Sequence, residues 1–195
     1  DINWEEKIYK KKRQINNYPF DWVVASVSKH ISKNKKNIAV ELGCGTGNNL
    51  EFLSGHGYSK IIGVDGSKSA IQYTKKKLKK NKKILLMQAD FSKTFFENVD
   101  LFLDRGSVTH NKKKVIKKIF KNVLSQLNSD GFFLSSLFSK KHDGFKDRTG
   151  LNSNQDYHSP FSVEDHAVFT KGVSVFYGVE ESINGIRSTS LNSGI

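Results

Sequence analysis

The chain has 195 residues, of which 26% are charged and 36% hydrophobic, and its 32 lysines and arginines exceed its 19 acids to give a formal net charge of +13. This length suits one domain with a substantial hydrophobic core, so we predict a single domain over residues 1–195. No apolar run approaches the ~20 residues of a membrane-spanning helix, and the polar N-terminal stretch has no secretory h-region. We therefore expect a cytoplasmic protein with no membrane partner.

The excess positive charge raises the question of a nucleic-acid ligand. A nucleic-acid enzyme would concentrate its basic residues and interleave aromatic ones. Abundant Lys, Asn, Ile and Phe are equally typical of an AT-rich genome. The basic runs are spread along the chain, at 10–13, 33–36, 75–83, 112–118 and 140–141. Solvated helix faces are the favoured interpretation, and a nucleic-acid partner is not favoured.

Residues 1–30 are predicted to form a helical N-terminal arm. Trp4 and Tyr9 are among its large apolar side chains, and Pro19 interrupts the helical pattern because the residue before a proline disfavours helix. A second apolar helix face follows at 20–27. These aromatic residues either pack against a sheet or form a lid over a ligand, and the two roles are compatible.

Strands and helices then alternate through a core at 37–138. The predicted strands are 37–42, 61–65, 84–88, 99–104 and 131–138, and the predicted helices are 48–56, one capped by Ser67, and 113–127. This alternation predicts an α/β, Rossmann-like, doubly wound and mostly parallel sheet with helices on both faces. Ligands bind such sheets in the crevice at the carboxyl ends of the first and fourth strands.

Residues 139–195 give a weaker signal and are expected on the substrate side. A polar loop covers 143–160, a short helix is expected at 161–166, and 173–179 alternates like a strand. At most one C-terminal strand is predicted, so this end of the sheet is expected to be divergent or truncated.

The most informative motif is Glu41-Leu-Gly-Cys-Gly-Thr-Gly47, at the end of the first strand. Its spacing differs from the dinucleotide fingerprint, because the sixth position counted from Gly43 is Asn48, and no Lys-Ser/Thr pair follows to make a P-loop. A tight turn without a ligand is the alternative. Three glycines between strand-end acids argue against it.

Two acids indicate which ligand the turn would hold. Glu41 would oppose a pyrophosphate but suits a positively charged cofactor, and Asp65, at the end of the second strand, can accept hydrogen bonds from a ribose diol. The combination favours S-adenosylmethionine, whose sulfonium and α-amino groups are both cationic.

These residues resemble the first motif of class I S-adenosylmethionine-dependent methyltransferases. In that family Asp65 would bind the ribose, and 89–91 would lie beside the adenine. The sequence 99–106 resembles the fourth strand in the Asp-Arg-Gly form of small-molecule methyltransferases of the tellurite-resistance and thiopurine type. The resemblance implies that the cofactor is bound by Glu41, Gly43, Cys44, Gly45, Gly47, Asp65, Gly66, Ser67, Asp90, Phe91 and Asp104.

Methyl transfer by in-line displacement mainly requires alignment, so a general base is optional. Arg105 is a candidate for holding a substrate group, with an ion pair to Asp104 as the alternative. His110 is a candidate base or a surface histidine. Cys44 is expected to be a small packed residue rather than a nucleophile. The histidines show no metal-binding spacing, so no metal is predicted.

The acceptor is predicted to be a small molecule. Enzymes that methylate nucleic-acid amino groups carry an Asn/Asp-Pro-Pro-aromatic turn after the fourth strand, whereas this chain has Asp104-Arg-Gly-Ser107. Two alternatives stay open: an RNA or protein methyltransferase that uses the basic surface, and a non-catalytic subunit that only binds S-adenosylmethionine. The identity of the acceptor and the oligomeric state are not predicted.

Overall fold

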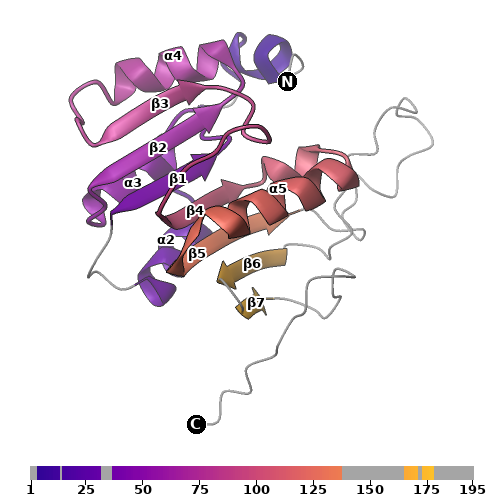
Figure 1. Cartoon of the computed structure of the whole chain (residues 1–195). Coiled ribbons are helices and arrows are strands. Elements are labelled where there is room, and N and C mark those ends of the chain that lie inside the picture. Colours follow the sequence, from indigo (N-terminus) through magenta and orange to yellow (C-terminus); the bar gives the residue numbers. More distant parts are fainter. Residues whose placement is uncertain (1–3, 14, 32–36, 138–164, 171–172, 178–195) are drawn as a thin grey trace.

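The computed structural model describes residues 4–13, 15–31, 37–137, 165–170 and 173–177. Figure 1 shows one twisted sheet, with α5 in front of β4 and β5 and with α2 and α3 behind the sheet. The strand order is β3-β2-β1-β4-β5-β6-β7. This confirms the predicted Rossmann-like sheet with helices on both faces.

The boundaries of the core elements lie close to the predicted ones. The strands are β1 (Ile38–Leu42), β2 (Lys60–Asp65), β3 (Ile84–Gln88), β4 (Val99–Arg105), β5 (Leu127–Leu137), β6 (Asp165–Thr170) and β7 (Val173–Tyr177). The helices are the π-helical turn η1 (Glu5–Tyr9), α2 (Asp21–His30), α3 (Asn48–Gly55), α4 (Lys68–Lys77), the 3₁₀ turn η2 (Val108–His110) and α5 (Lys113–Gln126).

Neighbouring strands from β3 to β5 are parallel, and the chain reverses its winding direction between β1 and β4. Successive side chains of a strand point to opposite faces. On β1 and β4, Ala39 and Leu101 belong to the core cluster that includes α2 and α3, whereas Val40 and Phe102 belong to the cluster under α5. Both faces of the central strands are therefore buried, which explains their continuous apolar sequences.

Strand β5 begins four residues before its predicted start. Val99 pairs with Leu127 but Leu101 pairs with Phe132, so the chain bulges out between these two pairs. The Asn128 amide donates to Asp100 Oδ1 at 2.6 Å within this bulge. Residues 128–130, which lie between the predicted helix and the predicted strand, are therefore an irregularity inside a longer strand.

The C-terminal strands correct two predictions. β6 pairs antiparallel with β5, and β7 pairs antiparallel with β6, so the expectation of at most one strand is wrong. Residues 165–166 begin a strand, and the predicted helix is wrong there; the polar loop at 143–160 lies outside the described residues. The apolar stretch of β6 is short and has charged residues beside it in the sequence, so it gives a weak strand signal. Its pairing with β5 is a long-range contact, which the local sequence pattern does not reveal.

Candidate functional site

A cavity of about 720 Å³ opens at the carboxyl ends of β1, β2 and β4, where the fold predicts a ligand. It is lined by eleven predicted site residues: Glu41, Gly43, Cys44, Gly45, Asp65, Gly66, Ser67, Asp90, Phe91, Arg105 and His110. The predicted residues Gly47 and Asp104 do not line it. The other lining residues are Trp4, Tyr9, Asn16, Phe20, Thr46, Asn48, Asn49, Gln88, Ala89, Gly106, Ser107 and Asn111.

The carboxylate of Asp65 holds the glycine turn in place from the end of β2. Its Oδ2 accepts the Gly45 N–H at 2.9 Å, and its Oδ1 accepts the Ser67 N–H at 2.8 Å. Burial raises the pKa of Asp65, although these two N–H groups stabilise its charged form. Each oxygen keeps a lone pair, so the carboxylate can still accept a hydrogen bond from a ligand hydroxyl.

Glu41 is the most unusual group in the site. Its side chain faces α3 and is only 2% exposed, and its Oε1 accepts a hydrogen bond from the Asn49 amide at 2.7 Å. Its Oε2 is buried without a hydrogen-bond partner among the described residues. Burial raises the pKa of Glu41 to about 8, with further contributions from Asp104 and Asp65. A buried acid with an unsatisfied oxygen beside a cavity is suited to a cationic ligand group.

The N-terminal arm lies over the glycine turn. A Cβ atom added to Gly45 would lie 2.7 Å from the Tyr9 hydroxyl oxygen, so a glycine is required for this close approach. Asn16 exchanges two hydrogen bonds with the Thr46 hydroxyl, at 3.1 and 3.2 Å. The Asn48 amide donates to the Tyr18 carbonyl at 2.9 Å. The arm therefore forms one wall of the cavity.

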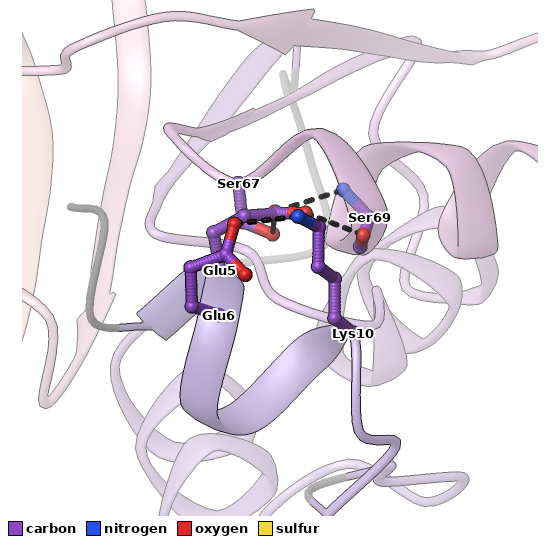
Figure 2. A network of polar contacts seen from close by, with 5 residues as sticks. All are labelled: Glu5, Glu6, Lys10, Ser67 and Ser69. Carbon is purple, nitrogen blue, oxygen red and sulfur yellow. Dashed lines mark hydrogen bonds and ion pairs between the residues drawn. The ribbon is translucent and has the colours of Figure 1, made fainter.

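Figure 2 shows a second attachment of the arm, made by Glu5. The carboxylate accepts hydrogen bonds from the hydroxyls of Ser67 and Ser69, each at 2.5 Å, and from the Ser69 N–H at 3.1 Å. The two hydroxyls are the main reason why the pKa of Glu5 falls to about 2. Ser67 also caps α4, as predicted, because its hydroxyl accepts the Ala70 N–H. Glu5 thus joins the arm to the first turn of α4.

Asp104 and Arg105 point to opposite sides of the sheet, as successive strand residues must. Asp104 is fully buried on the α5 side, where it accepts the N–H groups of Ser107 and Val108 and the Ser135 hydroxyl, at 2.8, 3.0 and 2.7 Å. Burial raises its pKa to about 6. In this arrangement Asp104 braces the end of β4 and does not contact the cavity.

Arg105 lies on the cavity side instead. Its guanidinium carbon is 4.3 Å from the centroid of the Phe20 ring, which belongs to the segment before α2. His110 lines the same cavity from η2, with its ring 5.1 Å from that of Trp4 in an edge contact. The two predicted catalytic candidates therefore share one cavity with aromatic residues of the arm.

The loop after β3 contributes Asp90 and Phe91. Burial alone would raise the pKa of Asp90, but hydrogen bonds from the Ser92 hydroxyl and N–H and the nearby Lys93 lower it. Asp90 is therefore a charged acceptor at the cavity wall. Phe91 adds an apolar surface that is continuous with the core under α5.

Three other predictions can be compared with the described residues. Burial raises the pKa of the Cys44 thiol well above its usual value, which disfavours a thiolate nucleophile. No group of His, Cys, Asp and Glu in the described part of the chain could hold a metal ion. Within the same ranges, no helix is long and apolar enough to cross a membrane.

Sequence reasoning missed several polar residues of the site, chiefly Asn48, Asn49 and Ser107. The signal available was weak: two adjacent asparagines at the start of a helix, directly after the glycine turn. Both are buried, and their amides join the arm and Glu41 to that turn. A buried polar side chain needs hydrogen-bond partners. Two such side chains next to each other in an apolar environment therefore indicate a binding site.

Residues 39–131 match the model of a family described as "Methyltransferase domain". No curated protein matches the chain significantly in sequence. Among solved structures, the chain is similar to TehB from Haemophilus influenzae, with 22% identity, a TM-score of 0.55, and coverage of 67% of this chain and 45% of that one.

Two further structures are similar over comparable lengths. An S-adenosylmethionine-dependent methyltransferase from Clostridium acetobutylicum ATCC 824 shows 23% identity and a TM-score of 0.56, covering 73% of this chain and 58% of that one. The N-methyltransferase NodS from Bradyrhizobium japonicum WM9, in complex with S-adenosyl-L-homocysteine, shows 15% identity and a TM-score of 0.55, covering 71% and 66%. The chain thus spans between 45% and 66% of the length of these structures, and the likeness establishes the fold.

Proposed function

We propose that this chain, which matches the methyltransferase domain family model over residues 39–131 and has the class I methyltransferase fold, transfers a methyl group from S-adenosylmethionine to a small-molecule acceptor. The family match supports the predicted enzyme class and agrees with the predicted cofactor. The nature of the acceptor rests on the geometry of the cavity.

The observation that carries the proposal is the buried carboxylate of Glu41. Its Oε2 has no hydrogen-bond partner among the described residues, and the side chain lines the cavity beside the glycine turn. Such a group is costly unless a ligand satisfies it, and a cation satisfies it best. A pyrophosphate would instead keep Glu41 protonated or be repelled by its charged form, which argues against a dinucleotide.

The remaining residues also fit S-adenosylmethionine. When bound, this cofactor supplies an electrophilic methyl group on a sulfonium. Asp65 retains acceptor capacity for the ribose hydroxyls, and Asp90 and Phe91 offer a charged acceptor and an apolar surface on the adenine side. The cavity volume of about 720 Å³ lies within the usual range for small-ligand sites.

The acceptor side favours a small molecule. Trp4, Tyr9 and Phe20 of the arm line the cavity, so the arm encloses part of the space in which the methyl group would be transferred. A cavity walled in this way by aromatic residues can orient a compact acceptor. We propose that His110 accepts the proton from an acceptor that loses one on methylation and that Arg105 holds a polar group, because both residues line the cavity.

Isothermal titration calorimetry with S-adenosylmethionine, S-adenosylhomocysteine and NAD tests the cofactor assignment. We expect the two sulfur compounds to bind and NAD to bind at least tenfold more weakly. A panel of thiols, chalcogen oxyanions, phenols and amines, assayed for release of S-adenosylhomocysteine, then tests the acceptor class. Tight NAD binding without any response to the sulfur compounds would contradict the proposal.

A further inference from the structure

Arg105 forms no salt bridge with an acid among the described residues. In the part of the chain that the structure describes, the only salt bridges are Lys10–Glu6 and Lys93–Asp90. The neighbouring Asp104 points to the other face of the sheet and is satisfied by three hydrogen bonds there. The ion pair with Asp104, which was the alternative role for Arg105, is therefore not among the salt bridges of the described residues, although the charge of Arg105 still lowers the pKa of Asp104 from a distance.

The Phe20 ring supports this guanidinium from one side. The central carbon of the Arg105 guanidinium lies over the Phe20 ring, 4.3 Å from the ring centroid. Phe20 is itself held by a hydrogen bond from its N–H to Asn49 Oδ1 at 3.2 Å, and the Asn49 amide is bonded to Glu41. A guanidinium held over an aromatic ring is attracted to the ring and still has N–H groups that can donate to a carboxylate.

Arg105 differs in charge from the other residues that line the cavity. Arg105 is the only Lys or Arg side chain among the described residues that line the cavity. The acids that line it are occupied or unsuited to pair with it: Asp65 accepts two backbone N–H groups, Asp90 pairs with Lys93, and Glu41 is bonded to Asn49. A cation that lies over an aromatic ring and has no salt-bridge partner among the described residues is a candidate site for an anion.

We propose that Arg105 on Phe20 forms the specificity subsite for the methyl acceptor, and that the acceptor is a small planar acid whose carboxylate or similar oxyanion binds Arg105. This inference rests on the proposed function, because it assigns the acceptor of the same cavity. The aromatic rings of Trp4 and Phe20 would contact the planar body of the acceptor. Arg105 acts by positioning, and the acid is recognised by charge and shape.

The test compares benzoate with benzamide, which have similar shapes but differ in charge. Each probe is titrated by calorimetry into the full chain saturated with S-adenosylhomocysteine. We expect benzoate to bind about tenfold more tightly, since charged hydrogen bonds contribute more than neutral ones. Arg105→Gln should remove this preference, and Arg105→Lys should retain part of it because it keeps the charge but loses the planar fork.

Two controls separate this site from general charge effects. Arg13 is exposed on the arm and does not line the cavity, so Arg13→Gln makes the same change in net charge and should preserve the benzoate preference. Phe20→Leu keeps an apolar residue but removes the stacking surface, and it should reduce the preference by several-fold. Thermal melting of each variant shows whether it is folded.

The outcomes distinguish this inference from the proposed function. If the native chain does not bind S-adenosylhomocysteine, the proposed function fails. If it binds S-adenosylhomocysteine but binds benzoate and benzamide equally, or neither of them, the acceptor assignment is overturned and the cofactor assignment stands. If Arg105→Gln weakens S-adenosylhomocysteine binding by more than tenfold, Arg105 belongs to the cofactor site and the inference is also overturned.

Discussion

A single buried carboxylate links the chemistry of this site to pH. The pKa of Glu41 in the folded protein is about 8, whereas an unfolded chain would show the ordinary value near 4.5. Between these values the folded state binds more protons, so Glu41 makes the ligand-free protein less stable as pH rises. A bound cation reverses this effect, because it stabilises the charged form.

We therefore predict that the affinity for S-adenosylmethionine increases as pH rises from 6 to 8, by up to about tenfold per unit while Glu41 is mostly protonated. Calorimetry in buffers with different ionisation enthalpies should detect the release of a proton on binding. Glu41→Gln keeps the size of the side chain and should bind weakly with little dependence on pH. A native affinity that is constant across this range would contradict the role of Glu41.

Gly47 illustrates a motif residue whose role is in folding. Its φ angle is +72°, and an added Cβ atom would lie 2.4 Å from Thr74 Cγ2. Gly106 has nearly the same φ, +74°, but an added Cβ atom there meets nothing within 4 Å. The two glycines thus share the backbone requirement and differ only in packing.

Gly47→Ala should lower the free energy of unfolding by ~1–3 kcal/mol more than Gly106→Ala, the usual cost of overpacking. Chemical denaturation measures both. Thr74→Ser removes the clashing methyl group and keeps the hydroxyl that donates to the Gly45 carbonyl. The Gly47→Ala change should therefore cost less in the Thr74→Ser background, and additive effects would show that the clash is not the cause.

Strand ends were the part of the site that sequence could predict. Glu41 and Asp65 follow apolar runs, and the topology of a parallel sheet brings such ends to one edge. The partners of these acids were not predictable, because Asn49 reaches Glu41 through helix packing and Glu5 reaches Ser67 across 62 positions of the chain. Side-chain contacts between distant segments have no local pattern.

At the scale of elements, too, strands with a clear local pattern were predictable, and strands that depend on pairing with distant segments were not. β1 to β4 were predicted within a residue of their limits because each is apolar and bounded by polar turns. β5 was predicted to begin too late because the polar residues 128–130 resemble a turn, although they form a bulge within the pairing with β4. β6 was missed because its strand character depends on its pairing with β5.

The attachment of the N-terminal arm to the start of α4 can be tested by mutation. Glu5 joins η1 to the start of α4, and its low pKa of about 2 means that the folded state favours the charged form. This contribution to stability is present above pH 4.5 and is lost as pH falls towards 2. Among the described residues, the salt-bridge partner of Glu6, one residue further, is the exposed Lys10.

Glu5→Gln should therefore loosen the arm, with faster hydrogen exchange in residues 4–13 and several-fold faster release of S-adenosylhomocysteine from the cavity that the arm lines. Glu6→Gln makes the same change in net charge but removes only an exposed ion pair, which contributes little. It should leave both rates nearly unchanged. Equal effects of the two substitutions would show that charge, and not the contact with Ser67 and Ser69, controls the arm.

At the scale of the whole molecule, the question is whether the +13 charge serves a ligand. In the described residues, exposed lysines occur on both sides of the sheet. One group lies on α4 and the turn after it, and a second group of similar density lies on α5, which covers the opposite face. A surface built to guide RNA to the cavity would have concentrated them at one rim.

We accordingly predict weak binding of single-stranded RNA with no dominant face. Changing Lys75, Lys76, Lys79 and Lys80 to Gln, or Lys114, Lys117, Lys118 and Lys121 to Gln, removes four exposed charges from one side of the sheet or the other. Each change should reduce the slope of log K against log salt by a similar amount, since each phosphate contact contributes about 0.7 to that slope for single strands. Fluorescence anisotropy with a labelled oligonucleotide, measured from 50 to 200 mM salt, gives both slopes. Affinity that survives at the higher salt and is lost only with the α4 set would instead indicate a docking face beside the arm, and the acceptor would then have to be sought among nucleic acids.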